Sequence, residues 1–341
     1  MIKHDPEIVG ILESVGISPD AVGEIIIGDT QAKPVHAQLL HSSLDADRLD
    51  YLLRDSRQAG VSFGTVELEY ILRQMRIEQC PIHRDNGAEE RIELVVFDGR
   101  GQHAIEHFLM GRYFHYTQVV QHKTIGAFEA VAKALIYKVL GTSLGSQYRN
   151  YDSIVTNIGT DAFYTDDYMW QLICKVSESS DDNFVRALWT CLSKRKKPSH
   201  ILTITDIIPK KPANSRAKPV NDSTYLLTKW LIKNMQDELA SEAGINSSYI
   251  GFVESQVHLE SIPSHLRSED CSLDDFPDDV RGAIRIIDKD GTISFLASDN
   301  KSLINKMVDY TSNTLDIFVV GDVNSENTNI LSKAIFQRAR K

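Results

Sequence analysis

The stretch SSLDADRLDYLLRDS, residues 42–56, decides the fold that we expect for this chain. Apolar residues recur in it at helical spacing, and aspartates and arginines stand between them. One side of such a helix carries three leucines, Leu49, Leu52 and Leu53. Another side carries two carboxylates and a phenol one turn apart, at Asp47, Tyr51 and Asp55, with Arg48 at its margin. The pattern predicts a helix whose apolar face packs against the core and whose polar face remains accessible to solvent or to a ligand.

Two interpretations of the polar face are open. A solvated face with ion pairs between residues four apart is the plain one. A carboxylate and an arginine beside a tyrosine also suit a pocket that holds a metal, a sugar and a phosphate.

Composition narrows the class of protein. The chain has 341 residues, which suggests about two domains, and 42% are hydrophobic. A net charge of −10 and a pI of about 5.6 mean that a large nucleic-acid-binding surface is not expected. The cysteines are widely spaced and form no paired metal-ligand pattern: Cys80, Cys174, Cys191 and Cys271. We expect a soluble, cytoplasmic protein, because there is no apolar signal core and no run of 18 apolar residues.

The rest of the chain divides near residue 200. Residues 1–80 are expected to be helical, RIELVVFDGRGQ is strand-like, and a long periodic helix covers about 104–140. Beyond Pro198 the segments SHILTITDII and LDIFVVGD predict strands, and AIRIIDKDGTISFLA predicts a hairpin around Asp290-Gly291. The predicted fold is a mainly α core over 1–200 and a smaller α+β domain over 201–341.

Two segments carry a resemblance to a known family. SSLDADRLDYLLRDSRQAGVSFGTVELEYIL and AIEHFLMGRYFHYTQVVQHKTIGAFEAVAKAL are similar to the HD-domain phosphohydrolases of the dNTP triphosphohydrolase type. That group includes the bacterial dGTPase-like enzymes and the SAM-and-HD-domain dNTPase. The resemblance implies that residues 1–200 form the distal part of an HD-type helical core. A weaker likeness extends to IRIIDKDGTISFLASDNKSLINKMVDYTSNTLDIFVV.

The resemblance also implies roles for single residues. Asp47 matches the last metal ligand of the family's His…His-Asp…Asp set. Arg48 and Arg112 match basic residues on the phosphates. Tyr51 matches the tyrosine packed on the deoxyribose, where it leaves no room for a 2′-hydroxyl, and Asp55 matches the carboxylate that accepts from the 3′-hydroxyl.

Further substrate contacts are predicted on the long helix. Arg112, Tyr116, Val119 and Lys123 would share one face at helical spacing, which suits one wall of a pocket and also ordinary core packing. The predicted contacts are Arg112, Tyr116 and Lys123. Tyr116 stands where the animal enzyme has a histidine. Val120 stands where the family commonly has a tyrosine near the base, so the resemblance does not indicate which base is recognised.

The first ligands of the family's metal site are not found upstream of Asp47. His4-Asp5 is formally an HD pair, but its context, KHDPEIVGIL, aligns with a later helix of the family. His36 and His41 are expected to pack or to cap. We therefore expect a divalent metal (Mg, Mn, Fe or Zn) in the complete enzyme but not in this chain alone.

Other motifs have plainer interpretations. We expect the histidines of the long helix to be satisfied or exposed rather than metal ligands: His103, His107, His115 and His122. The basic run Lys194–Lys197 suits a helix end. The Asp288–Gly291 segment, which resembles the start of a calcium loop, is expected to be a hairpin turn.

By resemblance, the complete enzyme hydrolyses dNTP to deoxynucleoside and triphosphate with a metal-activated water. We expect no such hydrolysis by this chain alone, and a second chain that supplies the His…His-Asp segment is the expected partner. The alternatives are a non-catalytic nucleotide-binding or oligomer-forming regulatory subunit, and a truncated gene product. A homo-oligomer formed through residues 201–341 is expected, and no membrane association.

Overall fold

The computed structural model describes residues 2–28, 34–83, 89–150, 152, 165–209, 223–257, 282–308 and 310–339. The described chain is mostly helical, with two small sheets. It forms two compact units. The first contains 1–119, 209–217 and 257–311, and the second contains 120–208, 218–256 and 312–341. Each unit therefore draws on residues from both sides of position 200, where we predicted the domain boundary.

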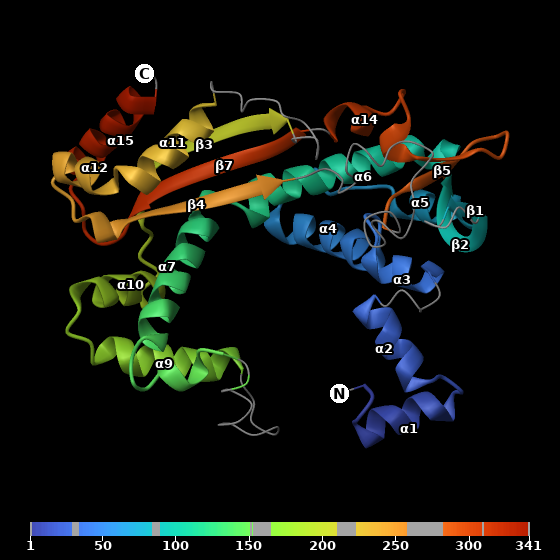
Figure 1. Ribbon diagram of the computed structural model, residues 1–341, viewed down its shortest axis with the longest axis horizontal. Coiled ribbons are helices and arrows are strands. Elements are labelled where there is room, and N and C mark those ends of the chain that lie inside the picture. The colour runs from blue at the N-terminus through green and yellow to red at the C-terminus, as the bar shows by residue number, and fades with distance from the viewer. Residues whose placement is uncertain are drawn as a thin grey trace. The chain divides into compact units, whose positions relative to one another are not determined.

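The first unit is built on helices (Figure 1). They are α1 (Pro6–Ser14), α2 (Pro19–Ile27), α3 (Pro34–His41), α4 (Ala46–Ala59), α5 (Leu68–Gln74), α6 (Gln102–His115) and α14 (Leu303–Met307), with the 3-10 turns η1 (Gly99–Gly101) and η6 (Leu296–Ser298). Ser18 caps α2 through a hydrogen bond from the Ala21 amide, as its position before a proline predicts. His41 Nε2 lies 3.1 Å from the carbonyl oxygens of Ile25 and Ile26, so the expected capping role of His41 is confirmed.

A four-stranded sheet accompanies these helices. Its order is β1 (Met75–His83), β2 (Glu89–Asp98), β5 (Arg285–Ile287) and β6 (Ile293–Phe295). The β5–β6 pair is the predicted hairpin, with Gly291 at a φ of 87°. The prediction of helix up to residue 80 is wrong after Gln74, because Met75–His83 pairs in register with β2. That pairing depends on a partner strand, which helical periodicity does not reveal.

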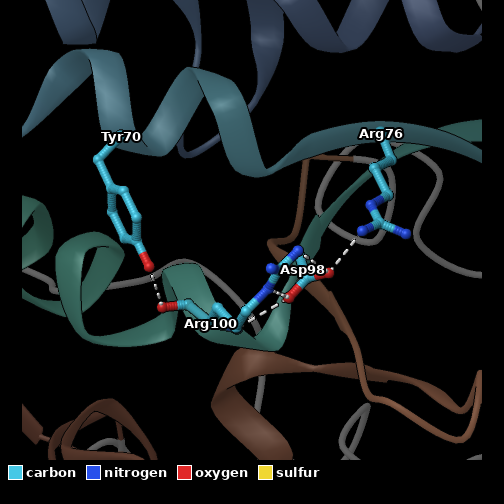
Figure 2. A network of polar contacts seen from close by, with 4 residues as sticks. All are labelled: Tyr70, Arg76, Asp98 and Arg100. Carbon is cyan, nitrogen blue, oxygen red and sulfur yellow. Dashed lines mark hydrogen bonds and ion pairs between the residues drawn. The ribbon is translucent and has the colours of Figure 1, made fainter.

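A polar network ties α5, β1, β2 and η1 together (Figure 2). Asp98 accepts from Arg76 at 2.7 Å and from Arg100 at 2.9 and 3.2 Å. The Tyr70 hydroxyl donates to the Arg100 carbonyl at 3.1 Å. Hydrogen bonds from Arg100 hold the pKa of Asp98 at about 2, below its ordinary value. Asp98, at the end of β2, therefore links α5, β1 and η1 within this unit.

The core of the first unit lies between its helices and β2. Leu52 of α4, Ile71 of α5, and Ile105 and Phe108 of α6 are fully buried in one cluster. Burial of such side chains contributes roughly 1.5–3 kcal/mol each. The core therefore fixes α4 against α6.

The second unit has a three-stranded sheet in the order β3 (Ser199–Pro209), β7 (Tyr310–Val319) and β4 (Ile250–Val257). Its helical elements are α7 (Lys123–Leu140), η3 (Ser146–Tyr148), α9 (Asp166–Glu178), α10 (Asn183–Ser193), α11 (Thr224–Asn234), α12 (Gln236–Ala243), η4 (Ser247–Tyr249) and α15 (Ser325–Ala339). Along β7, Leu315, Ile317 and Val319 pack in the cluster that includes α11, α12 and α15, while Phe318 packs in the cluster of α7, α9 and α10. Because side chains alternate between the two faces of a strand, β7 contributes to a hydrophobic cluster on each face of the sheet.

The predicted single helix over 104–140 is interrupted. α6 ends at His115, a π-helical turn η2 spans Tyr116–Val120, and α7 begins at Lys123. His122 has extended backbone and caps α7, its Nδ1 accepting from the Thr124 amide at 3.3 Å. The prediction of one continuous helix over 104–140 is therefore wrong, because the π-helical turn and the extended His122 interrupt it. None of the helices in the described ranges combines the length and apolarity that crossing a membrane requires.

Candidate functional site

Local sequence explains why α4 forms where it does. The carboxylate of Asp45 accepts from the Arg48 amide at 2.8 Å and caps the helix. Gly60 ends it in the left-handed region at a φ of 69°. Leu49 and Leu52 are buried, as their spacing predicts. With these leucines in the core, Tyr51 and Asp55 on the polar face of α4 lie toward His115 of α6.

A glycine lets α6 approach the loop that follows α4. A Cβ at Gly111 would lie 2.6 Å from the Phe63 carbonyl oxygen and 3.6 Å from a methyl of Leu52. Only a residue without a side chain fits this contact. The close approach brings the last turn of α6 beside Tyr51 and Asp55.

Five aromatic and charged residues meet there. The rings of Tyr51 and His115 lie 5.6 Å apart at 36°, and the rings of His115 and Tyr116 lie 6.1 Å apart at 85°. His115 Nε2 is 3.4 Å from Asp55 Oδ2. The Arg112 guanidinium lies 5.6 Å from the centre of the Tyr116 ring. We call Tyr51, Asp55, Arg112, His115 and Tyr116 the α4–α6 cluster.

Burial dominates the electrostatics of the cluster. It raises the pKa of Tyr51 to about 12, although the nearby Arg112 cation acts in the opposite direction. Burial also raises the pKa of Asp45, against the Arg48 amide and the Arg48 and Arg112 charges. The positive charge of Arg112 therefore favours the ionised forms of both Asp45 and Tyr51, against the effect of burial.

Several polar atoms of the cluster are buried without a hydrogen bond. They are the Tyr51 hydroxyl and both ring nitrogens of His115. The His115–Asp55 contact is close enough for an ion pair but does not have hydrogen-bond geometry. Each unsatisfied buried group costs roughly 1–3 kcal/mol. Such a concentration of unsatisfied groups is typical of a site that binds a polar ligand.

Asp47 and Arg48 lie in the first turn of α4. Arg48 is half-buried, its guanidinium contacts the Ser42 carbonyl oxygen, and Nη1 lies 3.6 Å from the Asp45 carboxylate. The Asp47 side chain belongs to an exposed residue.

The described residues do not fit a metal centre by themselves. In the ranges that the structure covers, no three His, Cys, Asp or Glu side chains converge as ligands. Asp5 of the His4-Asp5 pair caps α1 instead, accepting from the Glu7 amide at 3.0 Å. The metal-ligand role of Asp47 stays a prediction.

Lys123 belongs to the second unit. It is exposed at the start of α7, and its charge adds to burial in lowering the pKa of His200. His200 Nε2 lies 2.8 Å from Thr203 Oγ1 and 3.6 Å from the buried Asp316 carboxylate. The predicted contact of Lys123 with the substrate stays a prediction.

The remaining motifs behave as simpler features. Lys194–Lys197 follows the end of α10, is exposed, and pairs with Asp322 through Lys196. His103 and His122 each have a partner, and His107 is exposed. His115 differs from the expectation for this group, because it is buried and unsatisfied.

Two residues of the site were not singled out from the sequence. Asp45 directly precedes the first periodic residue of α4, which is the position of an N-cap. His115 continues the inward stripe of Phe108 and Gly111 at spacings of three and four. The stripe indicates burial of His115, but no sequence signal reveals that Asp55 lies opposite.

Similarity to curated proteins is confined to part of the chain. YwfO, an uncharacterized protein of Bacillus subtilis, is 33% identical over 139 residues, 40% of this chain and 29% of that protein. MG461, an uncharacterized protein of Mycoplasma genitalium, is 33% identical over 122 residues, 35% of this chain and 27% of that protein. MJ1154, an uncharacterized protein of Methanocaldococcus jannaschii, is 28% identical over 113 residues, 33% of this chain and 23% of that protein. The matches thus span less than a third of each relative, and no protein-family model matches the chain.

Two solved structures are similar over most of the chain. A hypothetical protein from Aquifex aeolicus has a TM-score of 0.53 and 17% identity, over 99% of this chain and 69% of that one. A phosphohydrolase from Bacteroides thetaiotaomicron has a TM-score of 0.49 and 19% identity, over 91% of this chain and 69% of that one. At such identities the likeness concerns the fold alone.

Proposed function

We propose that the chain binds a 2′-deoxynucleoside triphosphate at the α4–α6 cluster, as part of an HD-type phosphohydrolase that yields deoxynucleoside and triphosphate. The observation that carries the proposal is convergence. Tyr51 lies beside Arg112 and Tyr116, and Asp55 faces His115, although the two segments are far apart in the sequence. Tyr51, Asp55, Arg112 and Tyr116 are among the residues to which the resemblance gives substrate contacts.

The chemistry of the cluster suits a deoxynucleotide. Tyr51 offers an aromatic face for the sugar ring, and burial raises the pKa of its neutral hydroxyl to about 12. Asp55, about half-exposed, can accept from a sugar hydroxyl.

Arg112 is the phosphate-binding group of this proposal. Its guanidinium has five donors in a planar fork, which matches phosphate oxygens, and it is half-buried beside Tyr116. Arg48, on the first turn of α4, is the second cation. Hydrolysis would further need the metal donors that the described residues do not provide, and we assign those donors to a second polypeptide.

Calorimetry with dGTP and GTP in buffer containing EDTA tests the binding. We expect dGTP to bind more tightly than GTP. Arg112→Ala should weaken dGTP binding about 10- to 150-fold, because a hydrogen bond to a charged group contributes about 1.5–3 kcal/mol.

Arg73→Ala is the matched control, since Arg73 is an exposed arginine paired with Glu69 on α5. It should leave the affinity unchanged. An equal loss in both variants, or a wild-type chain that binds neither nucleotide, would show that the α4–α6 cluster is not a nucleotide site.

A further inference from the structure

His115 is the most deeply buried titratable side chain of the α4–α6 cluster. Its side chain is 2% exposed, whereas that of Asp55 is 45% exposed. The polar groups around it are Asp55 and Tyr51 of α4, Tyr116 of η2, and the Arg112 guanidinium stacked on Tyr116. In the His115–Asp55 pair, the imidazole therefore lies inside the protein, and the carboxylate is partly exposed to solvent.

A histidine that merely fills space would be expected to have satisfied nitrogens. Even the exposed His103 and His122 have polar partners, Glu106 and the Thr124 amide. By contrast, neither ring nitrogen of His115 has a hydrogen bond, although Nε2 stands 3.4 Å from Asp55 Oδ2. Small adjustment of the Asp55 rotamer would complete a bond between them. Among the described residues, His115 is the one ion-pair partner that Asp55 has.

We propose that His115 is a positioning residue for Asp55. Neutral His115 donates its Nε2 hydrogen to Oδ2, which leaves Oδ1 directed outward to accept from the 3′-hydroxyl of a bound 2′-deoxynucleotide. The identity of the ligand rests on the function proposed above, whereas the His115–Asp55 hydrogen bond does not.

The consequence is selectivity for the 3′-hydroxyl. A carboxylate held by a buried donor keeps its orientation when the ligand is absent, so less conformational freedom is lost on binding. A ligand without the 3′-hydroxyl makes no bond to Asp55 and should not depend on His115. The two kinds of ligand should therefore respond differently to replacement of the imidazole.

The first experiment compares dGTP with 2′,3′-dideoxy-GTP by calorimetry in EDTA. The wild-type chain should bind dGTP at least tenfold more tightly. His115→Leu should reduce that ratio to within about twofold of one, with dideoxy-GTP binding little changed. His115→Gln keeps an amide donor near the Nε2 position and should retain much of the ratio. His107→Leu, at an exposed position of the same helix, should retain all of it.

Equal weakening of both ligands in His115→Leu and His115→Gln would show that His115 only packs, and would overturn the proposal. Thermal unfolding of each variant, followed by circular dichroism, verifies that it is folded.

The second experiment needs no nucleotide and separates failure of this inference from failure of the proposed function. NMR of the imidazole of His115 in the full chain should show the tautomer protonated at Nε2. Asp55→Asn should lower the pKa of His115, because the carboxylate that favours the imidazolium is removed. If the titration of His115 is the same in Asp55→Asn as in wild type, the two side chains do not interact and the inference fails, whatever the nucleotide data show.

Discussion

The buried His115 is one of the groups that make the free energy of unfolding depend on pH. His115 lies between Tyr51 and Tyr116 and faces Asp55. The Asp55 carboxylate favours the imidazolium and so opposes part of the lowering of the His115 pKa that burial causes. Burial lowers the pKa of His115 below its ordinary value near 6.5. The folded chain therefore binds a proton at this residue less readily than the unfolded chain does.

The sign of the pH dependence follows. As the pH falls from about 7 to 5, the unfolded chain takes up the proton first, so the free energy of unfolding decreases, by at most about 1.4 kcal/mol per pH unit. His115→Leu should flatten this slope in urea unfolding measured across the range. His107→Leu, at an exposed position, should keep it. A slope that His115→Leu leaves unchanged would assign the pH dependence to other groups.

At the scale of elements, α4 owes its start to one residue. Asp45 caps the helix, and it is 4% exposed. The neighbouring Arg48 guanidinium lies against the Asp45 carboxylate and the Ser42 carbonyl oxygen, so the cap also fixes the first turn. At the other helix, the π-helical turn η2 begins at Tyr116, where α6 ends.

Removing the cap should loosen α4. We expect Asp45→Ala to lower the free energy of unfolding by about 1 kcal/mol, within the range of about 0.5–2 for lost N-caps. Asp45→Asn keeps a capping oxygen and avoids the burial of a charge, so it should be as stable as wild type. The midpoints of urea unfolding measure both changes. Equal destabilisation by Ala and Asn would mean that the charge, and not the cap, holds the helix.

At the scale of the whole molecule, the chain passes more than once between its two compact units. Unit one takes residues from three parts of the sequence, and so does unit two. The candidate site residues Asp47, Tyr51 and Arg112 all belong to the first unit. The prediction that residues 201–341 mediate self-association stays a prediction.

Catalysis is expected to appear only on mixing. By the resemblance, Asp47 is the last ligand of a metal site whose other ligands come from a His…His-Asp segment. The chain alone should release no triphosphate from dNTP with Mn²⁺ or Mg²⁺, whereas mixing with a polypeptide that carries that segment should restore release. Asp47→Ala should abolish the restored activity.

Asp50→Ala is the control, since Asp50 is exposed on the same helix and pairs with Arg54. It should leave the restored activity intact. Activity of the chain alone, or restored activity that survives Asp47→Ala, would contradict the assignment of Asp47.

Local pattern was enough to predict α4, the hairpin at Gly291 and the strands β2, β3 and β7. Their signals are spacing, caps and turn residues, which act over a few positions. The inward face of Leu49 and Leu52 followed from the same spacing.

Long-range contacts decided the rest. Met75–His83 is a strand because β2 lies beside it, and the helix predicted over 104–140 breaks where His122 adopts extended backbone. The meeting of Asp55 with His115 depends on the close approach at Gly111, between segments whose separation in sequence no periodicity spans. Packing of distant segments is a property of the whole core, and so the site could be predicted as a set of residues but its geometry only from the tertiary structure.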